Sequence, residues 1–186
     1  MPEAAGQAGP GAPYARYRAE VREDLIDYNG HLYDAGYAVV LSEANELLFA
    51  DLGLSESYRV ATGRAMYTAE SHIRYLAESK RGDVLAAESL LVSADPKRMR
   101  VHTLLSRGDG TAVATGEHLY LHVDEAAGGV TAMPADRWAE VEALLSAHAS
   151  LARPAHLGLG VGAPGRAASG HPGASGHRGP GGARPG

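Results

Sequence analysis

Apolar residues recur every three or four positions over residues 34–52, and this spacing predicts a long amphipathic helix. The apolar stripe consists of Tyr37, Leu41, Ala44 and Leu48, ends at Asp51, and is widened by Val40 and Leu47. Asp34 is the predicted N-cap, because its carboxylate can accept a hydrogen bond from a backbone N–H of the first turn. Gly53 suits the left-handed conformation that commonly ends a helix.

Four long segments of strand-like composition follow this helix. They are residues 65–76, 83–94, 98–106 and 112–123. The turns between them contain Arg81-Gly82, Asp95-Pro96 and Gly108-Asp109-Gly110, which are typical turn residues. Long consecutive strands joined by tight turns favour an antiparallel meander.

Three shorter elements complete the order. They are a strand over residues 16–21, a helix over 55–62 and a final helix from Pro134 to Ala149. The long helix can bury its apolar stripe only against the sheet. The order therefore predicts an α+β hot-dog fold, in which an antiparallel sheet wraps around a long central helix. Because so small a sheet leaves edges and apolar faces exposed, we expect a homodimer or tetramer.

The two ends of the chain differ from its middle in composition. Residues 1–13 are rich in Gly, Ala and Pro, and Gly and Pro supply 16 of the 34 residues from 153 to 186. Neither segment carries enough periodic apolar residues to offset the entropy of ordering. We therefore expect a hot-dog domain over residues 14–152 between a disordered N-terminus and a disordered tail rich in Gly, Pro and Arg.

Charge and cysteine content exclude several classes of protein. The formal charge is −5, but the tail holds four arginines and no acid while Glu3 alone is charged before Tyr14, which leaves −8 for residues 14–152. A domain this acidic is poorly suited to bind nucleic acid. The chain has no cysteine, so it has no disulfide and no thiolate nucleophile. It has no apolar run of membrane-spanning length and no secretory leader pattern, so we expect a cytoplasmic protein.

The run Asp27-Tyr28-Asn29-Gly30-His31 is the strongest candidate for chemistry. It lies between a predicted strand and the long helix, and the N-terminus of a helix offers unpaired N–H groups and a partial positive charge. Asp27 can act there as a nucleophile or a general base while these N–H groups hold a developing oxyanion. The alternative is structural: Asp27, Asn29 and Gly30 are also plain turn residues.

His31 has two interpretations. It can polarise a carbonyl or orient Asp27, or it can simply bind backbone where the chain enters the helix.

Polar residues also gather on two of the predicted strands. Glu70, His72 and Arg74 alternate along one face, which is either a solvated surface or a face that meets the Asp27 loop of a partner subunit. Glu117 shares the predicted apolar face of its strand, where a carboxylate is costly unless it is paired or functional.

The opposite face of that strand carries His118, Tyr120 and His122. His118 and His122 lie about 13 Å apart on a strand and cannot share one ion, so we predict no metal site.

Several of these motifs resemble one known family. Asp27, Gly30, His31 and Tyr37 match in order and spacing the start of hot-dog thioesterases of the 4-hydroxybenzoyl-CoA thioesterase-like superfamily. The runs 67–74, 114–118 and 122–124 are similar to those of betainyl-CoA thioesterases, which are encoded with, or fused to, carnitine dehydrogenases. The resemblance covers roughly residues 21–154.

This resemblance implies an acyl-CoA thioesterase of carnitine metabolism, with Asp27, His31 and Asn29 as catalytic candidates. It also implies that the oxyanion contact comes from a backbone N–H near Tyr33 and Asp34. The remaining candidates for the substrate site are Gly30, Glu70, His72 and Glu117. The candidates for binding the CoA phosphates are Lys80, Arg81, Lys97 and Arg98.

A short polar acyl-CoA is the expected substrate, with betainyl-CoA favoured, and no cofactor beyond CoA is implied. A trimethylammonium group would need aromatic rings or carboxylates around it. The rings available are Tyr28, Tyr33, Tyr37, Tyr67 and Tyr75, and the candidate carboxylates are Glu70 and Glu117. Two alternatives remain: a hot-dog enoyl-CoA hydratase or dehydratase, and a non-catalytic acyl-CoA-binding protein.

Overall fold

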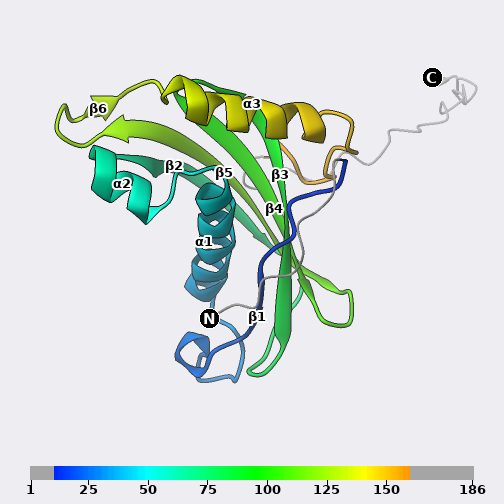
Figure 1. The fold of residues 1–186 in the computed structure, drawn as a ribbon. Helices are drawn as coiled ribbons and strands as arrows, with labels where there is room; N and C mark the ends of the chain where they lie inside the picture. Colours follow the sequence, from blue (N-terminus) through cyan, green and yellow to red (C-terminus); the bar gives the residue numbers. More distant parts are fainter. Residues whose placement is uncertain (1–10, 160–186) are drawn as a thin grey trace, which may run out of the picture.

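In the computed structural model, which describes residues 11–159, a curved sheet encloses one long helix (Figure 1). The elements are β1 (Arg18–Glu20), η1 (Glu23–Leu25), α1 (Asp34–Asp51), α2 (Glu56–Thr62), β2 (Arg64–Tyr75), β3 (Val84–Asp95), β4 (Arg98–Arg107), β5 (Ala112–Asp124), β6 (Gly129–Val130) and α3 (Ala135–His148). The boundaries of the long helix and of the four long strands agree with the predicted ones to within one residue. The sequence pattern missed the single turn η1 and the two-residue strand β6.

The strand order differs from the predicted meander. The sheet runs β1-β3-β4-β5-β2, with β6 added beside β5. β3, β4 and β5 do form an antiparallel meander, but β2 pairs with β5, so that Tyr67 lies opposite Leu121. Turn residues predict that the chain changes direction, but they do not predict which strands pair. The place beside β3 that a meander would give to β2 is taken by β1. The segment 76–83 therefore carries the chain from one edge of the sheet to the other.

The N-cap of the long helix lies one residue before the predicted position. Tyr33 is the N-cap with extended backbone angles, and Asp34 is the first helical residue, so the prediction of Asp34 as N-cap is wrong by one position. The Asp34 carboxylate instead accepts the N–H of Ala35 at 2.8 Å. At the other end Gly53 has φ +69°, the left-handed value expected after the last turn.

A buried polar network fixes α1 to the sheet. Asn45 lies on the buried face of α1. Its Nδ2 donates to the Tyr120 hydroxyl at 2.8 Å, and its Oδ1 accepts from the Thr103 hydroxyl at 3.1 Å. Ser89 lies 2.9 Å from the same threonine. Because each buried polar group finds a partner, the network fixes where α1 lies on the sheet without leaving a desolvated group unsatisfied.

From Glu117 to His122, the two faces of β5 are the reverse of the prediction. His118, Tyr120 and His122 are buried, while Glu117 is only partly buried. Tyr120 packs edge-to-face on Phe49 of α1, with ring centroids 4.7 Å apart. Aromatic and imidazole rings supply enough apolar area to face a helix even though they carry polar atoms, and the alternation of charged and apolar residues did not reveal this.

One edge of the sheet is covered, whereas the other is open within the part of the chain that the structure describes. β1 and α3 cover the β3 edge, where His148 Nδ1 accepts the backbone N–H of Leu91 at 2.9 Å. The outer edge of β2 has no strand beside it in the described part of the chain. β2 has 12 residues, five of which, residues 67–71, are exposed in succession. A long unpaired edge of this kind is suited to pair with another strand.

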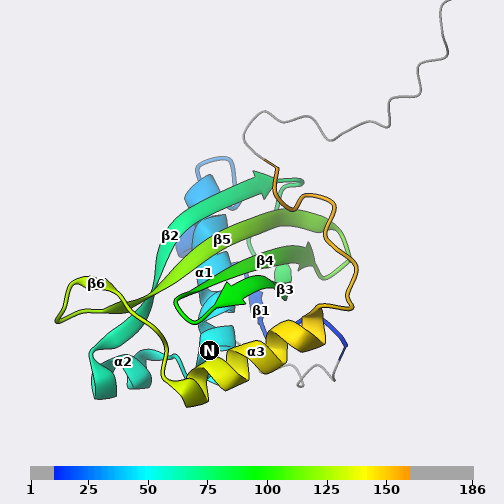
Figure 2. The ribbon, with the colours of Figure 1, turned by 90° about the horizontal axis from the view of Figure 1, so that it is seen from above.

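The chain after α3 turns back over the sheet and runs past β4 and β5 toward β2 (Figure 2). It places the N–H of Gly158 2.7 Å from the Glu117 carboxylate. The packed part of the chain thus extends beyond the predicted boundary at residue 152. The expected tails over 1–10 and 160–186 lie outside the described residues. Within residues 11–159, no helix is long and apolar enough to span a membrane.

The buried His118 makes stability depend on pH. Burial lowers the pKa of His118 to about 4, so the imidazole is neutral in the folded protein. An unfolded chain takes up a proton near pH 6.5, so this contribution to stability is complete above that pH and is lost as the pH falls toward 4. We expect His118 alone to lower the free energy of unfolding by about 2 kcal/mol between pH 6.5 and 5. Urea unfolding at both pH values measures this.

The His118→Gln variant is the control for that measurement. It removes the titrating group, so its free energy of unfolding is expected to change less between the two pH values than that of the wild type. Equal changes in both proteins would contradict this role for His118.

Candidate active site

The run from Asp27 to His31 forms a tight, closed loop. The N–H of Asp27 donates to the carbonyl of His31 at 2.8 Å, and the N–H of Gly30 donates to the carbonyl of Asp27 at 3.0 Å. Gly30 has φ +82°, a left-handed conformation that glycine adopts without steric cost. The flanking residues Ile26 and Leu32 pair across the loop. The loop is therefore a small hairpin that ends two residues before α1.

The carboxylate of Asp27 is held by this loop. Its Oδ1 accepts the backbone N–H groups of Asn29 at 2.8 Å and of His31 at 3.1 Å. Among residues 11–159, the one partner of Oδ2 is the side-chain amide of Asn29, which donates to it at 3.4 Å. The N–H of His31, assisted by that of Asn29, holds the pKa of Asp27 below its ordinary value. Asp27 thus forms a turn and also keeps one ionised oxygen free for chemistry.

The start of α1 leaves one backbone donor available. The N–H of Tyr33 donates to Leu25, and that of Ala35 is taken by the Asp34 side chain. Within the described residues, the N–H of Asp34 has no acceptor. It also lies at the positive end of an 18-residue helix. Of the two residues expected to supply an oxyanion donor, the structure leaves Asp34 free to do so.

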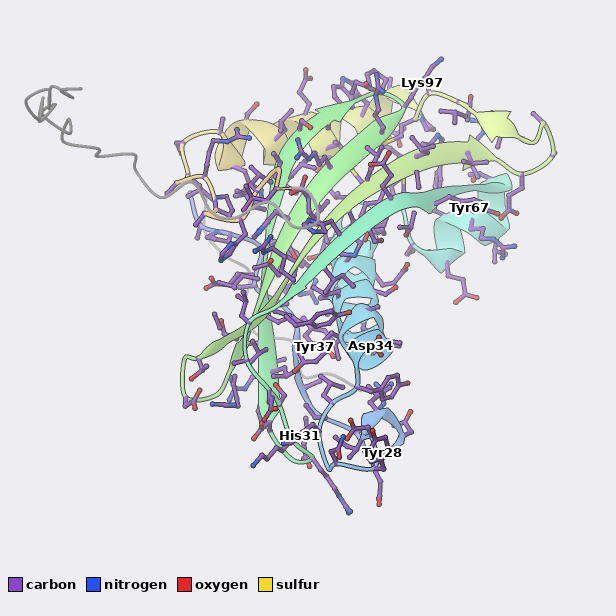
Figure 3. All side chains as sticks on the ribbon, turned by 180° about the vertical axis from the view of Figure 1, so that it is seen from behind. Tyr28, His31, Asp34, Tyr37, Tyr67 and Lys97 are labelled. Carbon is purple, nitrogen blue, oxygen red and sulfur yellow. The ribbon has the colours of Figure 1, made fainter. Side chains whose placement is uncertain are left out.

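A hollow of about 570 Å³ lies between this loop, the start of α1 and the end of β2. Its lining is Asp27, Asn29, His31, Leu32, Tyr33, Asp34, Tyr37, Tyr75, Leu76, Ala77 and Glu78. Figure 3 shows Asp34 and Tyr37 at the N-terminal end of α1, with His31 and Tyr28 in the loop beyond it. All five predicted catalytic and oxyanion residues thus share one hollow.

Glu78 belongs to this hollow and was not a candidate from the sequence. Its carboxylate lies 3.3 Å from His31 Nε2. The segment 76–83 brings it there, because Leu32 donates its N–H to Ser79 at 2.8 Å and His31 pairs with Lys80. Only the true strand order could have revealed this neighbour, since Glu78 lies in what a meander would make a distant hairpin turn.

Glu70, His72 and Glu117 lie elsewhere in the same chain. They line a second hollow of about 460 Å³ together with Ser71, Arg100, His118, Leu119, Gly158 and Leu159. Arg100 forms an ion pair with Glu117, which also accepts the N–H of Gly158. Burial raises the pKa of Glu117, but Gly158 and Arg100 outweigh it and the net pKa is lowered. The carboxylate that the sequence marked as unusual is a paired one.

The four candidate phosphate-binding cations are split between the two ends of the sheet. Lys80 and Arg81 follow the segment that lines the Asp27 hollow, and Arg81 pairs with Glu23 at 3.0 Å. Lys97 lies at the far end from His31 (Figure 3), and its neighbour Arg98 pairs with Asp95. Within one chain, only the first pair lies near the hollow.

The titration of Asp27 can be measured directly. We expect the carboxyl carbon of Asp27 to titrate with a midpoint below about 3.9, the ordinary value, because two backbone N–H groups stabilise its ionised form. Carbon-detected NMR from pH 2 to 7 measures this midpoint. Asn29→Ala keeps both N–H groups and is expected to leave it low, whereas a midpoint above 4 in the wild type would contradict the geometry.

Comparison with known proteins identifies similar sequences. A family model described as the thioesterase-like superfamily matches residues 21–147. The chain is 42% identical over 151 residues to an L-carnitine dehydrogenase/betainyl-CoA thioesterase of Agrobacterium fabrum, covering 80% of this chain and 30% of that protein. It is 36% identical over 149 residues to a betainyl-CoA thioesterase of Pseudomonas aeruginosa, covering 80% and 94%. The chain thus spans less than a third of the first relative and nearly all of the second.

Solved structures agree with the fold. A putative thioesterase from Pseudomonas putida superposes with a TM-score of 0.70 at 29% identity, covering 82% of this chain and 97% of that one. A hypothetical protein from Staphylococcus aureus, solved in complex with CoA, gives a TM-score of 0.77 at 24% identity, covering 86% and 100%. The hot-dog fold predicted from the element order is therefore confirmed.

Proposed function

The chain belongs to the thioesterase-like superfamily, and from this premise we propose that it hydrolyses an acyl-CoA thioester, with betainyl-CoA as the favoured substrate. The two relatives named as betainyl-CoA thioesterases support the substrate. The first of them also carries L-carnitine dehydrogenase in its name, which supports a role in carnitine metabolism.

One observation carries this proposal: Asp27 and Asp34, each with a polar group that is weakly bonded or unbonded, line the same hollow. Asp27 Oδ2 lacks a strong partner, and the N–H of Asp34 has none among the described residues. A thioester carbonyl placed between them can accept the N–H while its carbon faces the carboxylate. The helix N-terminus then stabilises the negative charge that develops on the carbonyl oxygen.

Two routes use this arrangement, and both begin at Asp27. Acting as a general base, Asp27 takes a proton from water while the water oxygen bonds to the acyl carbon. The carbon–sulfur bond then breaks, and the departing sulfur takes up that proton, so that CoA leaves as a thiol and Asp27 is ionised again. Acting as a nucleophile, Asp27 bonds to the acyl carbon and expels CoA, and water then cleaves the anhydride. Carboxylate, water and backbone donor suffice for both, so we propose no cofactor beyond the CoA of the substrate.

His31 and Asn29 act on Asp27 rather than on the substrate. Both donate backbone N–H groups to Oδ1, and the His31 imidazole lies 3.3 Å from the Glu78 carboxylate. We therefore assign them as positioning residues that fix the orientation of the Asp27 carboxylate.

We further propose that two copies of the chain pair along β2 to complete the site. The unpaired edge of β2, with its exposed residues 67–71, supports this pairing. In such a dimer Glu70 and His72 of one copy can face the Asp27 loop of the other. Lys80 and Arg81, next to the hollow, are the favoured contacts for the CoA phosphates.

Replacing Asp27 tests the central assignment. We expect Asp27→Asn to lower kcat for thiol release from betainyl-CoA by a factor of about 100 or more, because the amide can neither attack nor accept a proton. The matched control is Asp24→Asn, which removes an exposed carboxylate that pairs with Arg22 and does not line the hollow. Release of free thiol, followed with a thiol-reactive dye, measures both variants.

Full turnover by Asp27→Asn would remove Asp27 from the mechanism. The same preparations separate the alternatives. Water addition to a short enoyl-CoA without thiol release would identify a hydratase, and tight CoA-ester binding without either reaction would identify a binding protein.

A mixture of two variants tests the shared site. Asp27→Asn and the double variant Glu70→Gln/His72→Ala are each expected to be impaired. Heterodimers of the two hold one site in which Asp27, Glu70 and His72 are all intact, so co-expression is expected to restore about a quarter of wild-type activity. Light scattering checks that dimers form. Activity no higher than the average of the two variants would contradict the shared site. Asp27, Glu70 and His72 would then either belong to a site within a single chain or play no part in the reaction.

A further inference from the structure

We infer that the tyrosine-lined side of the Asp27 hollow, centred on Tyr75, is a binding site for a quaternary ammonium group and makes the site selective for cationic acyl groups. This inference rests on the proposed function, since it concerns the acyl group at the same site. It assigns the selectivity to Tyr33, Tyr37 and Tyr75, with Asp34 and Glu78 as the accompanying charges.

The tyrosines are arranged to offer rings rather than hydroxyl groups. Tyr37 is buried and donates its hydroxyl to the carbonyl of Ala77 at 3.1 Å. Tyr75 is 54% exposed, and its hydroxyl donates to the carbonyl of Asp34 at 3.3 Å. The two rings meet edge-to-face with centroids 5.4 Å apart. Tyr37 thus supports Tyr75, whose ring is the accessible surface and whose hydroxyl is already occupied.

Carboxylates predominate among the ionisable groups of the hollow. Its lining contains Asp27, Asp34 and Glu78, no lysine or arginine, and one histidine, His31, whose Nε2 lies 3.3 Å from the Glu78 carboxylate. Arg107 is nearby, but it donates to the backbone carbonyl of Glu78 and its guanidinium pairs with Asp109. A quaternary ammonium cannot donate a hydrogen bond, so ring faces and unneutralised carboxylates are the groups that stabilise it. An anionic acyl group would be repelled in the same place.

Because the betainyl group is short, a site for its quaternary ammonium must lie beside the carbonyl carbon that reacts. Its nitrogen is two bonds from the carbonyl carbon, about 2.5 Å away, as in a glycine backbone. A cation site outside the catalytic hollow could not reach it. The Asp27 hollow contains the carboxylate, the free N–H of Asp34 and the tyrosines together.

The other tyrosines that the sequence suggested lie outside this site. Tyr28 is 97% exposed and does not line the hollow. Tyr67 donates its hydroxyl to Glu125 at 2.9 Å, toward the other end of β2 (Figure 3). The candidate carboxylate Glu117 is paired with Arg100. Which tyrosines can contact the cation therefore depends on their position in the fold and not on residue type alone.

The test compares betainyl-CoA with 3,3-dimethylbutyryl-CoA, which has the same shape but carries carbon in place of the charged nitrogen. We expect wild-type kcat/KM to be at least about tenfold higher for the cationic ester. Tyr75→Leu is expected to lower this ratio about tenfold, whereas Tyr75→Phe, which keeps the ring, should retain most of it. Asp34→Asn is expected to lower the ratio as well, because it removes a carboxylate from the lining.

Two matched controls keep the comparison specific. Tyr28→Leu removes an exposed tyrosine of the same loop, and Asp24→Asn removes an exposed carboxylate outside the hollow. Both are expected to leave the ratio unchanged. A wild-type ratio near one, or a ratio that neither Tyr75→Leu nor Asp34→Asn alters, would overturn the inference while leaving the thioesterase assignment intact.

A binding measurement separates the inference from the proposed function. Tetramethylammonium is titrated into the protein while the ring signals of the tyrosines are followed by NMR, with tert-butanol as the neutral probe. We expect shifts of the Tyr75 signals with the cation alone and their loss in Asp34→Asn. Such shifts without any thiol release would support the cation site and overturn the hydrolase. Absence of shifts in the wild type would overturn the cation site.

Discussion

The candidate site depends on one crossing of the chain. Because β2 pairs with β5 and β1 covers β3, the segment 76–83 must pass from one edge of the sheet to the other. It passes the N-terminal end of α1, where Ser79 accepts the N–H of Leu32 and Lys80 pairs with His31. This contact joins the Asp27 loop to the end of β2. Without it, Glu78 would not lie beside His31.

The elements themselves were predictable because each has a local cause. The bounds of α1 and of the long strands were predicted to within one residue. The prediction used the spacing of apolar residues, the glycine after the last helical turn and the turn residues between strands. Strand order has no such local cause, since a turn sequence such as Arg81-Gly82 looks the same whether its strands pair or not. The missed neighbour Glu78 and the wrong meander therefore share one origin.

The structure brings together the candidate residues that are close in sequence, and it adds one neighbour that is not. The residues from Asp27 to Asp34 share a hollow because a closed loop and a helix start place them there. Glu117 was singled out because alternation put it on an apolar face, yet the buried face of β5 is the one with His118 and Tyr120. Its partner Arg100 lies on another strand, and only the register of β4 and β5 brings them together.

The structural role of Asp27 and the chemical role that we propose for it are compatible. The N–H groups of Asn29 and His31 that make it a turn residue bind a single oxygen, Oδ1. They favour the ionised form of the carboxyl group, and by binding one oxygen they fix the orientation of the group at the edge of the hollow that Asp27 lines. A carboxylate without such partners would be free to rotate, and ordering it would cost entropy at each encounter with substrate. The turn therefore supplies the preorganisation that a reactive carboxylate needs.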